Sequence, residues 1–138
     1  MKKYVVSEVD SIAEREVRRF EIGGKAIALA RLNGEFFALI DRCPHGGAPL
    51  SGGRFAHQVE SDGPGDYRVC RADELLRCPW HGWEYDLRTG QSWSDPKSTR
   101  TRALKTEQVK GSDLVKGPYV AETVPVTVEG NYLIVELP

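Results

Sequence analysis

Two short stretches of the sequence each place a cysteine close to a histidine. In RCPWHGWEYD, two residues separate Cys78 from His81. In DRCPHGGAPLSGG, one residue separates Cys43 from His45. A thiolate and an imidazole at such spacing serve nucleophilic catalysis or bind a metal. The chain has only three cysteines and three histidines, and two of each lie in these motifs, so a mixed Cys/His metal site is favoured.

Four ligands of this kind are compatible with two metal centres. One is a structural zinc ion bound tetrahedrally by two cysteines and two histidines. The other is a two-iron, two-sulfide cluster in which the cysteines bind one iron and the histidines bind the other. Zinc fingers and ribbons usually take like ligands from each knuckle, whereas here each loop contributes one of each. The pattern therefore favours two loops that grip a two-metal cluster from opposite sides.

The two motifs, CPHGGAPLSGG and CPWHGWEYD, resemble the two ligand boxes of Rieske iron-sulfur proteins. The resemblance rests on C-x-H-G followed at a distance by C-P-x-H-G-W, and the strand-like segments on both sides extend it over nearly the whole chain. It implies a Rieske-type 2Fe-2S cluster as the cofactor. By this resemblance, Cys43 and Cys78 would bind the inner iron, and His45 and His81 would bind the outer iron near the surface.

Aromatic residues of the second motif are candidates for shielding or tuning such a cluster. Trp80 and Trp83 would stiffen and shield the loops, although core packing is an equally common role for a tryptophan. Tyr85 sits where a tyrosine hydroxyl donates to a ligand cysteine in the respiratory-chain type of Rieske protein. That type also has a cysteine pair joined by a disulfide, and the corresponding positions here hold Ala48 and Trp80. The chain is therefore more similar to the soluble ferredoxins and oxygenase Rieske domains of bacterial multicomponent systems.

This resemblance implies single-electron transfer. The chain would carry electrons from a flavin reductase to a terminal oxygenase or a similar acceptor, and would not be an enzyme itself. The sequence contains no pattern for a mononuclear iron triad, a nucleotide-binding fold or a nucleophile-base pair. A fixed Rieske subunit of a larger oxygenase or nitrite reductase is one alternative. A structural zinc domain for protein interaction is an alternative from another class.

Length and charge limit the other partners. The chain has 138 residues, which suits a single Rieske domain spanning 1–138. Nineteen Lys and Arg against 20 Asp and Glu give a formal net charge of −1, so we expect no nucleic-acid or membrane partner. No apolar run approaches the roughly 18 residues that span a bilayer. Three cysteines do not make a secreted disulfide framework. We expect a soluble, cytoplasmic protein that is a monomer when isolated.

The segments around the motifs predict an all-β, Rieske-like fold of antiparallel sheets with a small cluster-binding subdomain made of the two ligand loops. The strand-like runs are KKYVVSEV, EVRRFEI, KAIALAR, EFFALI, WEYD, QSW, ETVPVTV and YLIVEL, and SIAERE is expected to form a helical turn. Gly23-Gly24 and Asn33-Gly34 are hairpin signals. Residues 94–117 show no apolar periodicity, so we expect a surface connection there.

The two motifs are further apart than a compact member of the family would require. Residues 46–77, 32 in number, separate His45 from Cys78. The cluster-binding part would span about 42–93, with an insertion at about 56–74. The turn-forming core SDGPGD of the insertion predicts a protruding loop or an extra hairpin. Cys70 lies in the insertion, and we expect it to be a thiol outside the ligand set.

Overall fold

The computed structural model describes residues 2–44, 47–79, 82–92, 101–116 and 121–138, and for residues 57–62, 66–74, 116 and 122 it describes the backbone alone. The described part is almost entirely β structure, as the sequence predicts. In chain order its elements are β1 (Lys2–Glu8), η1 (Val9–Ser11), β2 (Val17–Ile22), β3 (Lys25–Leu32), β4 (Glu35–Ile40), η2 (Leu50–Gly52), β5 (Arg54–Gly63), β6 (Asp66–Arg77), β7 (Glu84–Asp86), β8 (Ala103–Leu104), β9 (Thr106–Lys110), α1 (Gly111–Lys116), β10 (Ala121–Glu122) and β11 (Asn131–Leu137).

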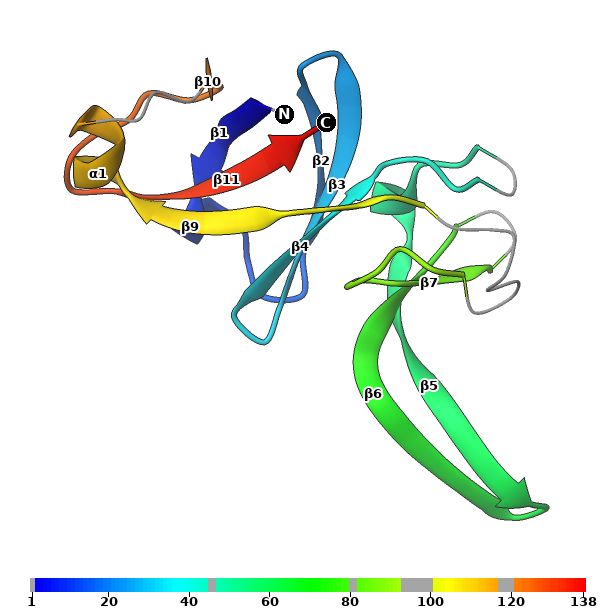
Figure 1. Ribbon diagram of the computed structural model, residues 1–138. Helices are drawn as coiled ribbons and strands as arrows, with labels where there is room; N and C mark the ends of the chain where they lie inside the picture. The colour runs from blue at the N-terminus through cyan, green and yellow to red at the C-terminus, as the bar shows by residue number, and fades with distance from the viewer. Residues whose placement is uncertain (1, 45–46, 80–81, 93–100, 117–120) are drawn as a thin grey trace.

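The described strands form three sheets (Figure 1). The first has the order β10-β1-β11-β9, the second β2-β3-β4-β8 and the third β5-β6-β7. The described strand pairs are antiparallel except for β1 with β10. Figure 1 shows both chain ends at the first sheet and the long β5–β6 hairpin reaching away from the rest of the molecule. The segment between the two motifs therefore takes the form of a hairpin.

Tight turns connect the strands of the second sheet at the predicted positions. Gly23 and Gly24 have φ of +58° and +79°, and Asn33 and Gly34 have φ of +52° and +77°. Two successive positive φ angles match the right-handed twist of a two-residue hairpin, and glycine and asparagine adopt them at the lowest cost. The sequence therefore determines this three-stranded meander locally.

The second sheet is buried on both faces, and strand β3 shows how. Ile27 and Leu29 point to one side, where they pack against apolar residues of the first sheet. Ala28 and Ala30 point to the other side, where they pack against the ligand loops. Successive side chains of a strand point to opposite faces, and small alanines let the loops approach closely. The hydrophobic core between this face and the loops consists of the buried residues Ala28, Ala30, Leu32, Phe37, Leu39, Cys43, Ala48, Leu50, Leu76, Cys78, Tyr85 and Leu87.

The expected surface connection at residues 94–117 is wrong for its described part. Residues 101–116 contain β8, β9 and helix α1, and β9 pairs with β11 over five positions from Thr106 to Lys110. Strand β9 has no fully buried residue along its length. Val109 is its one apolar residue and packs on the first sheet, but one half-buried valine makes no apolar period, so periodicity could not reveal the strand.

The strand expected from YLIVEL is present, whereas the strand expected from ETVPVTV is wrong beyond Glu122. YLIVEL forms β11, but its partners are β1 and β9, whereas β10 ends at Glu122. Pro125 has no N–H for a ladder, and Thr123 donates from N and Oγ1 to the carbonyl of Val5. Val124 and Val126 instead cover the outer face of the first sheet.

The expected helical turn and the strands expected after the second motif are found only in part. The helical turn expected in SIAERE lies slightly earlier, as the 3-10 turn η1. WEYD contains strand β7, whereas the run QSW forms no ladder in its described part: Ser92 makes an isolated bridge with Tyr85, and Trp93 lies outside the described residues. No helix in the described part of the chain is long and apolar enough to cross a membrane.

Candidate metal centre

The two motifs form two loops that start at strand ends. The first loop leaves β4 after Ile40 and ends at η2, where Leu50 begins the 3-10 turn. The second loop joins the end of β6 at Arg77 to the start of β7 at Glu84. Loops that leave a rigid sheet are where proteins commonly place binding residues, because the sheet holds their ends in position.

The two loops share one backbone hydrogen-bond pattern. In each loop the cysteine N–H donates to the carbonyl five residues later, and the cysteine carbonyl accepts from the N–H of a glycine four residues later. The four bonds are Cys43 N to Ala48 O at 2.8 Å, Gly47 N to Cys43 O at 2.6 Å, Cys78 N to Trp83 O at 2.7 Å, and Gly82 N to Cys78 O at 3.1 Å. The loops are therefore structural repeats of one turn, although their sequences differ.

A glycine in the left-handed region closes each turn. Gly47 has φ of +81° and Gly82 has φ of +71°, a region that other residues adopt at a steric cost. Counted from the cysteine as the first residue, the histidine is the third residue in the first loop and the fourth in the second. His45, His81 and also Trp80 lie outside the described residues.

The two cysteines converge on one apolar cluster. Cys43 is 0% exposed and Cys78 is 2% exposed, and both are buried thiols of the same cluster. Two cysteine sulfurs that come from matching loops and are buried away from water suit a metal centre that is closed on its inner side. Among the described residues no group of three or more potential metal ligands is gathered, and both expected histidines lie outside that part. The sulfur half of the donor set therefore fits a Rieske-type cluster.

Tyr85 lies directly against the first cysteine. Its hydroxyl oxygen is 3.0 Å from Cys43 Sγ, and its side chain is 0% exposed. A thiolate carries no proton, so the hydroxyl must donate to it when Cys43 is ionised as a ligand. The two side chains are therefore in hydrogen-bond contact, while the expected role of Tyr85 as a donor to a ligand cysteine stays a prediction. Trp83 is half-buried and packs against the same cluster.

A buried carboxylate closes the base of the first loop. The side chain of Asp41 is 0% exposed and accepts hydrogen bonds from Ser51 N at 2.7 Å and Ser51 Oγ at 2.6 Å. Arg19 of strand β2 adds an ion pair at 2.8 Å. Asp41 and Ser51 flank the loop, so their bonds hold its two ends together, and Arg19 ties both ends to the second sheet.

The two loops touch where glycine is required for space. A Cβ atom on Gly53 would lie 2.0 Å from the carbonyl oxygen of Arg77, the residue before Cys78. Next to this contact, Arg54 at the start of β5 pairs with Arg77 at the end of β6. The close approach of these backbones sets the spacing between the loops.

Sequence reasoning did not identify Arg19, Asp41, Ser51 or Gly53 as parts of this site. Asp41, Ser51 and Gly53 all lie within the stretch DRCPHGGAPLSGG quoted for the first motif. Their roles depend on partners that only the fold brings near, so no local pattern marks them.

Known proteins share both the sequence and the fold. The sequence model of the Rieske [2Fe-2S] domain matches residues 2–116. The chain is 32% identical over 130 residues to the ferredoxin component of the p-cumate 2,3-dioxygenase system of Pseudomonas putida, covering 93% of this chain and 80% of that one. The ferredoxin of carbazole 1,9a-dioxygenase from Nocardioides aromaticivorans IC177 superposes with a TM-score of 0.65 at 19% identity, covering 98% and 97% of the two chains. A chain from a complex of reduced oxygenase and oxidised ferredoxin in carbazole 1,9a-dioxygenase gives a TM-score of 0.59 at 24% identity, covering 76% and 83%.

Proposed function

Because the chain belongs to the Rieske [2Fe-2S] domain family, we propose that it is a one-electron carrier between a reductase and a terminal oxygenase. The observation that carries the proposal is the pair of matching loops that bury Cys43 and Cys78 in one hydrophobic core. The similarity to a dioxygenase ferredoxin component, over 93% of this chain and 80% of that one, supports a separate carrier rather than a catalyst.

The four motif residues would hold the cluster. Cys43 and Cys78 would bind the inner iron, and His45 and His81 would bind the outer iron. When bound, the cluster accepts and releases a single electron. Two neutral histidines in place of two thiolates leave the oxidised site uncharged and the reduced site at −1, which makes reduction easier than at an all-cysteine site.

The residues around the sulfurs would set the reduction potential. The hydroxyl of Tyr85 lies 3.0 Å from Cys43 Sγ, so it would donate to the ligated thiolate and would stabilise the extra negative charge of the reduced state. Two features that raise the potential in the respiratory-chain type are absent from this sequence: Ala48 and Trp80 stand at the positions of its disulfide, and Trp83 stands where it has a serine donor. Rieske centres span about −150 to +300 mV, and we expect a midpoint below about +50 mV here. Protein-film voltammetry measures it, and a midpoint near the top of the range would refute these tuning roles.

The proposal is tested by reconstituting the purified chain anaerobically with iron and sulfide. We expect a red-brown protein with two irons and two labile sulfides per chain, and a single reversible one-electron wave. Bound zinc and a colourless protein would instead support the zinc-domain alternative. Incubation with zinc alone in a parallel sample provides the matched control.

The location and assembly of the protein are part of the same proposal. A cytoplasmic location is supported by the low cysteine count and by the two buried thiols. A fixed subunit of a larger enzyme would need its partners for stability, whereas a carrier is stable alone. Sedimentation of the reconstituted chain as a monomer that cycles reversibly between redox states supports the carrier. Aggregation of the isolated chain, corrected by co-expression with an oxygenase, would support the subunit.

A further inference from the structure

A wide groove runs beside the first ligand loop. It has a volume of about 1210 Å³ and lies between strand β2, the start of β3, the loop and the residue before β8. Gly47 and Pro49 of the loop form part of its wall. A smaller hollow adjoins it across Arg42 and Arg102 and reaches Pro44, the neighbour of Cys43. The groove therefore extends to the loop that would hold the cluster.

Two of the cations along the groove are neutralised within the protein. Arg18 pairs with Glu16 at 3.0 Å, and Arg19 pairs with the buried carboxylate of Asp41 at 2.8 Å. The N–H of Ala13 and the guanidinium of Arg18 lower the pKa of Glu16, so this carboxylate stays ionised. These two arginines have structural roles and leave little charge for a ligand.

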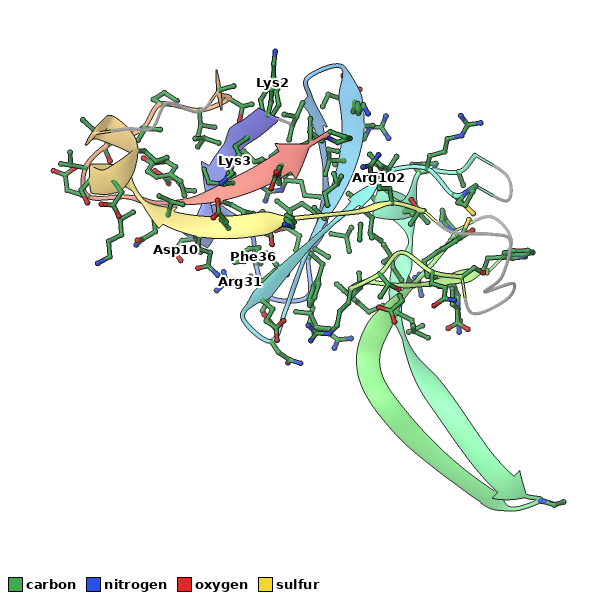
Figure 2. The ribbon with its side chains drawn as sticks, viewed as in Figure 1. Lys2, Lys3, Asp10, Arg31, Phe36 and Arg102 are labelled. Carbon is green, nitrogen blue, oxygen red and sulfur yellow. The ribbon has the colours of Figure 1, made fainter. Side chains whose placement is uncertain are left out.

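Three other cations of the groove have no partner within the described part of the chain. The side chains of Lys25, Arg42 and Arg102 are exposed and make no ion pair or hydrogen bond there. They come from separate segments, and the structure brings them to one surface. A Cβ atom on Gly47 would lie 3.7 Å from Arg42 Nε, so the Arg42 guanidinium lies over the first ligand loop. Figure 2 shows Arg102 where the body of the molecule meets the loops, far from the tip of the β5–β6 hairpin.

We propose that this groove docks an acidic surface segment of the protein that exchanges electrons with this chain. The inference rests on the proposed function and adds to it where the partner sits and which charge it presents. The chain as a whole carries a formal charge of −1, so the three cations form a local feature that opposes its net charge. Such a patch steers an oppositely charged partner and orients it on encounter.

The shape of the groove favours a protein surface over a small anion. A site for a small anion uses buried donors directed at a single point. Here the buried polar side chain in the wall, Asp41, is an anion already bound to Ser51 and Arg19, and the available cations are long, exposed and spread along the groove. This arrangement suits several carboxylates carried on one segment.

Two triple variants with the same net charge test the proposal. The groove variant is Lys25→Gln, Arg42→Gln and Arg102→Gln, and the body variant is Lys2→Gln, Lys105→Gln and Lys110→Gln, which removes three exposed cations outside the groove. Both are prepared as cluster-loaded protein. The probe is a fluorescein-labelled peptide of ten glutamates, followed by anisotropy at low ionic strength.

We expect the groove variant to bind the peptide at least about fivefold more weakly than the body variant, and the difference to vanish in high salt. Equal affinities of the two variants would overturn the proposal. Displacement of the peptide by millimolar phosphate at constant ionic strength, but not by chloride, would also overturn it in favour of a small-anion site.

Electron transfer to small complexes links the groove to the cluster. The reduced protein is mixed in a stopped-flow instrument with ferricyanide, a trianion, or hexaammineruthenium(III), a trication. We expect the groove variant to react at least about threefold more slowly than the body variant with ferricyanide, and no more slowly with the ruthenium complex. Equal ferricyanide rates for the two variants would overturn the proposal. Failure of the unmodified protein to take up a cluster or react with either complex would instead refute the proposed function.

Discussion

The two ligand loops have the same backbone geometry but are held in place by different means. The second loop connects β6 to β7, and the pairs Leu75–Asp86, Leu76–Tyr85 and Arg77–Glu84 position both of its ends. The first loop leaves the second sheet and enters the third, so its two ends belong to different sheets and no ladder joins them. A strand ladder is thus available to one loop only.

The Asp41 network takes the place of that ladder. Its bonds to Ser51 join the ends of the first loop, and its ion pair with Arg19 connects them to β2. In the described part of the second loop, Arg77 pairs with Glu84 at 3.4 Å, and Arg77 is 56% exposed. The same turn geometry thus depends on a buried charge in the first loop and on backbone pairing in the second.

Removing a ligand should have the largest effect and should treat both loops alike. Each of Cys43→Ser, His45→Ala, Cys78→Ser and His81→Ala opens the coordination of one iron, so we expect colourless or cluster-poor protein. Iron and sulfide analysis with visible absorption measures the loss.

Cys70→Ser is the matched control for these substitutions. Cys70 lies in β6, where its backbone pairs with Gln58, and the structure describes only the backbone of this residue. We expect its variant to keep the full spectrum. If only the Cys70 variant lost iron, the ligand assignment would be wrong.

Crowding the contact between the loops should have the next largest effect. In Gly53→Ala the new Cβ would meet the Arg77 carbonyl at 2.0 Å, so the two backbones must separate. We expect a loss of about 3 kcal/mol of stability and reduced cluster content. Gly52→Ala is the control, because its Cβ meets Pro79 Cγ at an ordinary 3.7 Å. Equal thermal midpoints for the two variants, measured by loss of visible absorption, would show that the contact does not set the loop spacing.

Removing one charge at each loop tests the comparison directly. Asp41→Asn leaves Arg19 without its buried partner, and we expect a cost of about 2 kcal/mol, reduced from that of a fully buried pair because Arg19 is 44% exposed. Glu84→Gln breaks an exposed pair and should cost less than about 1 kcal/mol. Urea midpoints of the cluster-loaded proteins measure both. A larger loss for Glu84→Gln would reverse the roles assigned to the two loops.

The smallest change in stability is expected for Tyr85→Phe, which removes one hydroxyl and keeps the ring. The lost donor to Cys43 should lower the reduction potential, because the reduced state loses a hydrogen bond to its extra negative charge. Protein-film voltammetry measures the shift, with Tyr132→Phe, a buried tyrosine of the first sheet, as the control. An unchanged potential in the Tyr85 variant would remove this residue from the tuning of the cluster.

Much of the site could be predicted because its signals are local in the sequence. The spacing of Cys43 with His45 and of Cys78 with His81 indicated the ligand set, and the glycine pairs indicated the hairpins of the second sheet. Such features depend on the conformations that a few adjacent residues can adopt. Strand β9 escaped prediction because its one apolar residue, Val109, makes no apolar period, and its pairing with β11 is not local in the sequence.

Residue chemistry and spacing along the chain were enough to give the turn positions and the family, and they predict the ligand types. The meeting of Arg19, Asp41 and Ser51, the packing of the loops on the alanine face of β3, and the groove shared by three cations could be seen only once the chain was folded. Each of these depends on which distant segments the sheets bring together. A side chain such as Asp41 becomes a buried clamp or a solvated surface charge according to what the fold places beside it, and that neighbour is not written in its own stretch of sequence.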